Sequence, residues 1–234
     1  DSDAPAALSF DVHYLNSAMA LRSLQCFATT LLLLPALAGQ QPDSRNLLSR
    51  ELPEWLDLGF TMRTRVERRS NLSFQPSLDD GVVLNRARLE ALVKPAKTWR
   101  IRLQIQDSRS GGLAPGRSRT GTDDPFDIRQ LYFEFGAEEG GAGWSSRLGR
   151  QTLFFSEERI FAERNWNNVS PAWDGAKAGY ARGRDRLDFF VAAQVENDPD
   201  DIDAALTGSR VAGFYGGLGS LLPNARLEPY WFFN

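Results

Sequence analysis

The chain has very little of the chemistry that enzymes and metalloproteins use most. It contains one cysteine, Cys26, and one histidine, His13, among 234 residues. A single cysteine cannot form an internal disulfide. His13 lies ahead of the predicted mature region. That region therefore has no histidine to act as a general base and lacks a ligand that most zinc sites use. The sequence also lacks a serine–histidine–aspartate set and a phosphate-binding loop, so we expect no enzyme activity, no cofactor and no bound metal.

Lysine and long apolar runs are also scarce. Three lysines stand against 24 arginines, and the formal net charge is -3, so whole-chain charge does not favour nucleic acid as a partner. No apolar run after residue 38 approaches the roughly 20 residues that a membrane-spanning helix needs. If the mature chain resides in a membrane, it must therefore cross with strands.

An export signal is predicted near the N-terminus. A short basic segment at 19–22 precedes an apolar stretch at 24–34, and small residues at Ala36 and Ala38 form a cleavage site. The alternative for the apolar stretch is a buried core helix. The expected divisions are a non-native upstream segment, a signal peptide, a polar lead-in and the main domain, at 1–18, 19–38, 39–54 and 55–234.

Arginine alternates with apolar residues in three segments, 58–66, 86–91 and 99–106. Because side chains alternate across a strand, each segment has one apolar face and one cationic face. A soluble β-sandwich would bury the apolar face and leave the charged face in water. A membrane barrel turns the apolar face to lipid and the polar face to a wet lumen.

Nine strands are predicted, each about as long as a tilted strand that crosses a bilayer. Their approximate bounds are 56–69, 82–94, 98–107, 127–137, 144–151, 173–182, 185–196, 209–219 and 225–234. The connections alternate between long and short, as in outer-membrane barrels, which have long extracellular loops and tight periplasmic turns. We therefore predict an all-β fold, a transmembrane antiparallel up-and-down β-barrel. Since nine strands do not close such a barrel, we expect an N-terminal portion of it.

A series of motifs carries a family resemblance. They are LGRQ at 148–151, EERI at 157–160, RNWNN at 164–168 and WDG at 173–175. In this order they resemble the alginate export family of outer-membrane porins, in which phenylalanine is usual where Trp173 stands. The DPFD motif at 124–127 and the RAR and QDSR motifs at 86–88 and 106–109 are also similar to that family. The resemblance covers 55–234.

The resemblance implies a monomeric barrel of about eighteen strands in the outer membrane, with an electropositive, arginine-rich lumen. The best-known members pass the anionic polysaccharide alginate to the cell exterior. For this chain it implies contact with outer-membrane lipid and with an anionic polysaccharide, and it leaves room for a periplasmic export partner. Because the family is broad, the resemblance does not identify the solute of this chain.

The candidate pore-lining and substrate-binding residues are arginines on the cationic faces. They are Arg63, Arg65, Arg86, Arg88, Arg100, Arg102, Arg147 and Arg150. A guanidinium group stays charged and binds carboxylates bidentately, which suits a polymer with repeated carboxylates. Each arginine could instead belong to a structural ladder with neighbouring glutamates such as Glu90 and Glu134. Arg150 does not share the parity of Arg147, so we expect a bulge near Gly149 to turn it inward.

The connection 152–172 is long enough to fold into the barrel and narrow it, or it could be a solvated extracellular loop. Its candidate constriction residues, with the aspartate that follows, are Glu157, Arg159, Arg164, Trp166 and Asp174. Calcium binding by the acidic segment 198–203 is an alternative to simple solvation, which we favour.

The sequence thus predicts an outer-membrane channel for anionic solutes, with export of an acidic polysaccharide such as alginate as the specific hypothesis. A general or substrate-specific porin for small anionic solutes is the second. A secreted carbohydrate-binding β-sandwich is an alternative of another class.

Overall fold

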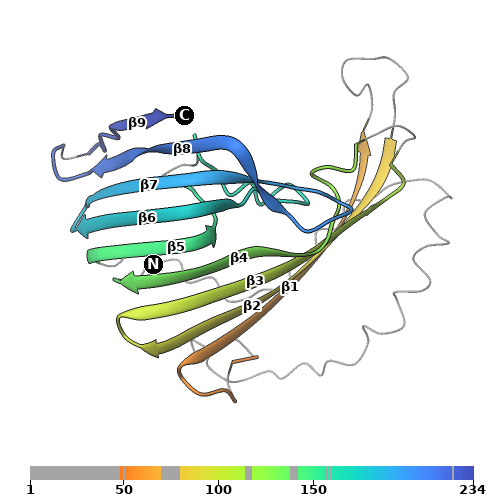
Figure 1. Cartoon of the computed structure of the whole chain (residues 1–234), viewed down its shortest axis with the longest axis horizontal. Helices are drawn as coiled ribbons and strands as arrows, with labels where there is room; N and C mark the ends of the chain where they lie inside the picture. Colours follow the sequence, from red (N-terminus) through yellow and green to blue (C-terminus); the bar gives the residue numbers. More distant parts are fainter. Residues whose placement is uncertain are drawn as a thin grey trace.

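The computed structural model describes residues 48–49, 51–69, 80–113, 118–137, 142–155, 158, 160–222 and 224–234. Within these residues, nine strands form a single sheet in chain order, and each strand is antiparallel to its neighbours (Figure 1). The strands are β1 (Leu56–Arg69), β2 (Asp80–Ala96), β3 (Trp99–Gly111), β4 (Asp124–Gly136), β5 (Gly143–Gln151), β6 (Trp173–Arg182), β7 (Asp185–Glu196), β8 (Ala204–Leu218) and β9 (Tyr230–Phe233). The sheet ends at β1 and β9 and is not closed, which confirms the prediction of an up-and-down sheet that forms part of a barrel.

Most of the predicted strand bounds are close to those observed, and the largest differences are in the last two strands. β8 begins at Ala204, earlier than predicted, and its first residues pair with Val195 and Glu196 across a register shift in β7. β9 is confined to Tyr230–Phe233. The alternation of long and short connections therefore fails at the end, where the connection 219–229 is longer than 197–203. An isolated bridge between Leu218 and Leu227 closes part of that longer connection.

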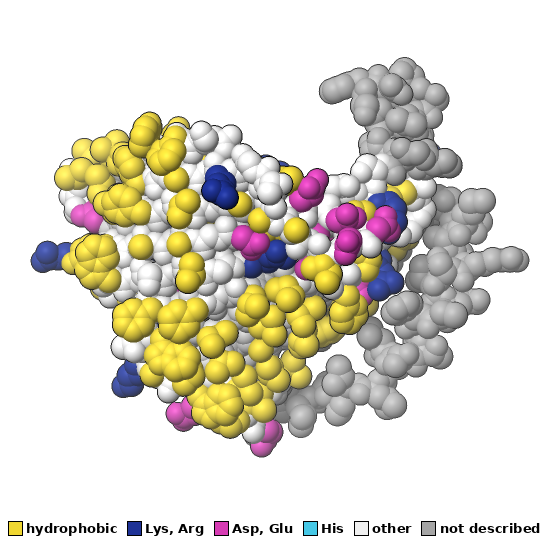
Figure 2. Space-filling view, viewed as in Figure 1, with side chains coloured by type: hydrophobic (Ala, Val, Ile, Leu, Met, Phe, Trp, Pro, Cys, Tyr) yellow, Lys and Arg dark blue, Asp and Glu magenta, His cyan; other side chains and the backbone are white. Residues whose placement is uncertain are grey.

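The two faces of the sheet are inverted relative to a soluble protein. Arg100 and Glu134 are each 5% exposed, whereas Phe133 is 44% exposed and Leu148 is 65% exposed. In soluble proteins arginine and glutamate are rarely buried unless they are paired, and large exposed apolar patches mark an interaction surface. In the orientation of Figure 1, hydrophobic side chains cover much of the lower part of the molecule, over β2 to β4 (Figure 2). This sidedness is that of a strand sheet with lipid outside and polar groups inside.

The sheet wraps around the connection between β5 and β6. Leu153 and Phe155 of this connection are buried in a cluster with Phe190 of β7 and Tyr215 of β8. Phe161 contacts Phe232 of β9, with ring centroids 5.3 Å apart. The same connection is hydrogen-bonded to arginines of β1, at the other edge of the sheet. Since both edge strands contact it, the described part of the connection 152–172 lies on the inner face of the curved sheet.

The fold excludes the sandwich alternative for the part of the chain that the structure describes, because its one sheet leaves the apolar side chains exposed instead of packing them on a second sheet. In the same residues no helix has the length and apolar character needed to span a bilayer. The predicted signal peptide and the segment ahead of it lie outside the described residues.

The inverted sidedness can be tested at Leu148, which pairs with Phe133 and Ala176 in the middle of the outer face. In the full-length protein folded into lipid vesicles, we expect Leu148→Arg to lower the free energy of unfolding by about 2–4 kcal/mol, the cost of a charged side chain on a strand face in contact with hydrocarbon. Leu221→Arg is a matched control, since Leu221 is 61% exposed but lies in the β8–β9 connection. Urea titration measures both, and equal tolerance of the two substitutions would contradict the assignment of faces.

Candidate functional site

The inner face carries the cationic side chains, and those of β1 and β2 are bonded to the inserted connection. Arg63 of β1 and Arg86 of β2 are directly paired across the two strands. Arg63 donates hydrogen bonds to the backbone carbonyls of Asn165, Trp166 and Asn167 at 2.7, 3.0 and 2.9 Å. Arg86 donates to the carbonyls of Asn165 and Asn167 at 3.0 and 2.8 Å. The two guanidinium groups therefore hold the same short stretch of backbone.

Arg65 and Arg88 extend this set of contacts, which we call the loop anchor (Arg63, Arg65, Arg86 and Arg88 with residues 165–170). Arg65 donates to the carbonyl of Trp166, and its guanidinium lies 4.2 Å from the centre of the Trp166 ring. Arg88 donates to the side chains of Asn165 and Ser170, both at 3.0 Å. Guanidinium is well suited to this role because it offers five donors in a fixed plane and stays charged.

Asn168 completes the attachment, and the sequence analysis did not identify it. Its side chain is 2% exposed, and its amide nitrogen lies within hydrogen-bonding distance of the carbonyls of Thr122 at 2.7 Å, Asn85 at 3.1 Å and Arg109 at 3.4 Å. The backbone carbonyl of Asn168 accepts a hydrogen bond from Ser108 at 2.9 Å. One asparagine thus joins the inserted connection to β2, β3 and the β3–β4 connection. Its place in the RNWNN motif was the available signal.

A register shift in β4 brings a further arginine to the inner face. Gln104 pairs with Gln130, but Ile105 pairs with Ile128, so both Arg129 and Gln130 are buried. Arg129 forms an ion pair with Glu163 of the inserted connection at 2.8 Å. Simple alternation could not have predicted this contact, because the extra residue of the shift changes the parity within the strand.

A second group of charges lies nearer the short turns, and we call it the turn-end cluster. Its cations are Arg100, Arg102, Arg147, Lys177 and Arg186, and its carboxylates are Glu90, Glu134 and Asp188. Glu134 bridges Arg100 and Arg147, and its contact with Arg147 is 2.6 Å. Arg102 pairs with Glu90, and about three-tenths of each of these two side chains is exposed. With five cations and three carboxylates, this part of the inner face carries positive charge.

Arg150 and Asp174 do not belong to either group. Between Gly143 and Gln151, strand β5 pairs with β4 and β6 without a register shift, so the expected bulge is absent and this prediction is wrong. Arg150 instead forms two hydrogen bonds with Asp174 at 2.9 and 3.1 Å and donates to the carbonyl of Asp203 at 3.0 Å. Gly149 adopts a φ of 124°, and a Cβ there would lie 2.4 Å from the carbonyl oxygen of Leu131, so glycine is required.

The remaining loop candidates differ in placement. Trp166 is exposed apart from its contact with Arg65, and Arg164 is exposed with a φ of 49°. Glu157 and Arg159 lie outside the described residues. Trp173, at the start of β6, packs against Phe161 with ring centroids 5.3 Å apart and borders the inner aromatic cluster.

A single up-and-down antiparallel sheet with an apolar outer face, a charged inner face and an inserted long connection defines a β-barrel protein of the outer-membrane type. A comparison with protein-family models supports this class and makes it specific. The family model described as alginate export matches residues 54–224, and the chain belongs to that family. It is a transport family of outer-membrane β-barrels. No curated protein and no solved structure matches the chain.

The attachment of the inserted connection can be tested at Asn168. We expect Asn168→Ala to lower the free energy of unfolding of the full-length protein by about 1–3 kcal/mol, because buried carbonyls lose their donor. Amide hydrogen exchange in 160–172 should become faster in the same variant. Asn167→Ala is the matched control: its side chain is exposed and its observed bonds use the backbone, so a change within about 0.5 kcal/mol is expected. An unchanged exchange rate in Asn168→Ala would refute this role.

Proposed function

We propose that the protein is an outer-membrane channel whose arginine-rich lumen passes anionic solutes, and that its solute is an acidic polysaccharide such as alginate. The observation that carries the proposal is the excess of cations in the turn-end cluster of the inner face, combined with membership of the alginate export family. An inner ring of arginine or lysine side chains is the usual device for anion selectivity. Lipid would contact the apolar outer face. The protein itself would reach the outer membrane after cleavage of its signal peptide near Ala38.

The two groups of charges would have different roles in such a channel. The loop anchor uses its guanidinium donors on backbone carbonyls and on the side chains of Asn165 and Ser170, so it would set the width of the lumen rather than bind solute. The turn-end cluster combines its cations with carboxylates that hold them in place. Weak and repeated contacts of this kind let a polyanion move along the lumen, whereas one tight site would retain it.

The two ends of the strands indicate how the channel would be oriented in the membrane. The turn-end cluster lies toward the connections 97–98, 137–142 and 183–184, and short turns face the periplasm in outer-membrane barrels. A polymer delivered from the periplasm would therefore meet this cluster first and the loop anchor second. A periplasmic export partner would dock at the same end.

Planar-bilayer conductance of the full-length protein tests the proposal. We expect anion-selective channels whose current is reduced by added polyuronate. Cation preference, or no channels at all, would refute it. Anion channels that polyuronate leaves unblocked would instead identify a porin for small anionic solutes.

The pair formed by Arg102 and Glu90 allows a charge test that leaves the loop anchor in place. Arg102→Gln removes a lumen cation and should lower the anion-to-cation permeability ratio, and Glu90→Gln should raise it. One charge at 8 Å in water contributes about 0.5 kcal/mol, so we expect a change of about twofold in each direction. Reversal potentials in a salt gradient measure the ratio, and shifts of the same sign in both variants would contradict an electrostatic cause.

A further inference from the structure

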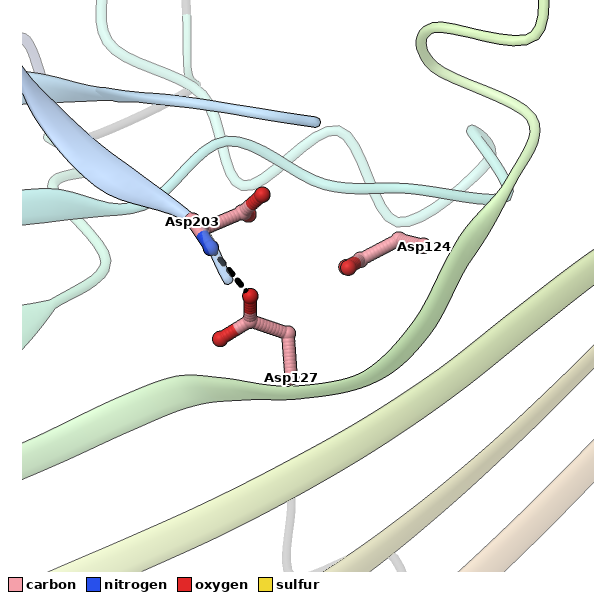
Figure 3. Close-up of side chains that lie close together, drawn as sticks. All are labelled: Asp124, Asp127 and Asp203. Carbon is pink, nitrogen blue, oxygen red and sulfur yellow. Dashed lines mark hydrogen bonds between the residues drawn. The ribbon is translucent and has the colours of Figure 1, made fainter. Parts of the chain in front are cut away.

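Three carboxylates from distant parts of the chain meet at the loop end of the sheet. Asp124 and Asp127 lie at the start of β4, and Asp203 immediately precedes β8. Oxygen atoms of the three side chains all lie within 4.8 Å of one another (Figure 3). Asp124 and Asp127 are each 4% exposed, and Asp203 is partly buried. From the sequence, calcium is an alternative only for the acidic segment 198–203, which ends at Asp203, and solvation is favoured there.

The hydrogen bonds of the cluster leave one buried oxygen atom without a donor. The backbone nitrogen of Asp203 donates to Oδ2 of Asp127, and Gln106 donates to Oδ2 of Asp124 at 3.2 Å. Within the described part of the chain, no donor reaches the buried Oδ1 atom of Asp124. Figure 3 shows that the Asp124 carboxylate points toward the other two. A buried carboxylate oxygen without a hydrogen-bond donor is destabilising. Because this atom also faces two more carboxylates, a bound cation would be a favourable partner for it.

Nearby cations do not balance the charge of the cluster. Arg150 approaches Oδ1 of Asp127 at 3.6 Å, but its guanidinium already binds the carboxylate of Asp174. Arg119, on the β3–β4 connection, pairs with Asp123 and Asp200 instead. Three carboxylates this close together repel one another, so a further cation would stabilise the cluster.

We propose that Asp124, Asp127 and Asp203 bind a divalent cation, and that the cation is Ca²⁺. Calcium takes six to eight oxygen ligands in a flexible geometry, whereas Mg²⁺ is usually held by one or two carboxylates and keeps several waters. The ion supplies the missing partner of Asp124 Oδ1 and joins the start of β4 to the β7–β8 connection. The proposal concerns a structural site and does not depend on the solute that the channel passes.

Titration of the full-length protein, folded in detergent micelles and treated with chelator, tests the site. We expect one Ca²⁺ per protein with a dissociation constant of about 10⁻⁴–10⁻³ M, the range of extracellular calcium modules. Calorimetry measures this binding, and Tb³⁺ luminescence that Ca²⁺ displaces reports the same site. Asp124→Asn and Asp203→Asn should each weaken binding at least about tenfold, because calcium affinity follows the charge count of the ligands.

Asp201→Asn is the matched control, since Asp201 is an exposed aspartate of the same connection and should bind Ca²⁺ like the parent protein. In chelator, Asp124→Asn should melt no lower than the parent protein, because it removes a buried like charge. Absence of saturable Ca²⁺ binding by the parent protein overturns the proposal, even if the Asp124 and Asp203 variants fail to fold. Unchanged affinity in both of those variants, or an equal loss in Asp201→Asn, also overturns it.

Discussion

The bonding of arginine side chains to backbone carbonyls inside the sheet is the interaction on which the rest of this structure depends. The inserted connection turns backbone carbonyl groups toward β1 and β2, where arginine side chains are their donors. The carbonyls of Asn165, Trp166 and Asn167 obtain theirs from Arg63 and its neighbours. Lysine could not replace these arginines, because its compact ammonium lacks the planar fork that reaches several acceptors at once. The inverted sidedness makes this possible, since the inner face is the one that carries charge.

The abundance of arginine therefore has two physical explanations, one for the loop anchor and one for the turn-end cluster. In the loop anchor, arginine is structural and binds the inserted connection through neutral groups, and Arg65 also forms an ion pair with Glu67. In the turn-end cluster, arginine is paired with carboxylates such as Glu134 and retains water-facing members such as Arg102. A high arginine count on inward strand faces thus overstates the number of groups that a passing solute could meet.

Local alternation was enough to predict the strands and the side of most residues in β1 to β4. It placed Arg88 and Arg100 opposite Leu89 and Ile101, and the structure shows the same division. Alternation fails where a register shift changes parity, as at Arg129. The roles of Asn168 and of the Asp124–Asp203 contact depend on segments far apart in sequence. Neither periodicity nor motif spacing contains that information.

The inserted connection also makes the two sides of the inner face unlike each other. Toward β7 to β9 it packs as an aromatic cluster that includes Phe155, Phe190 and Phe232, with Lys177 4.8 Å from the centre of the Phe155 ring. Toward β1 to β3 it is held by polar contacts, which keep charged groups along that wall. An apolar cluster gives a hydrated polyanion nothing to bind and excludes water from its path. Within the described strands, a polyanion that entered the lumen would therefore make its contacts along the charged wall and in the turn-end cluster.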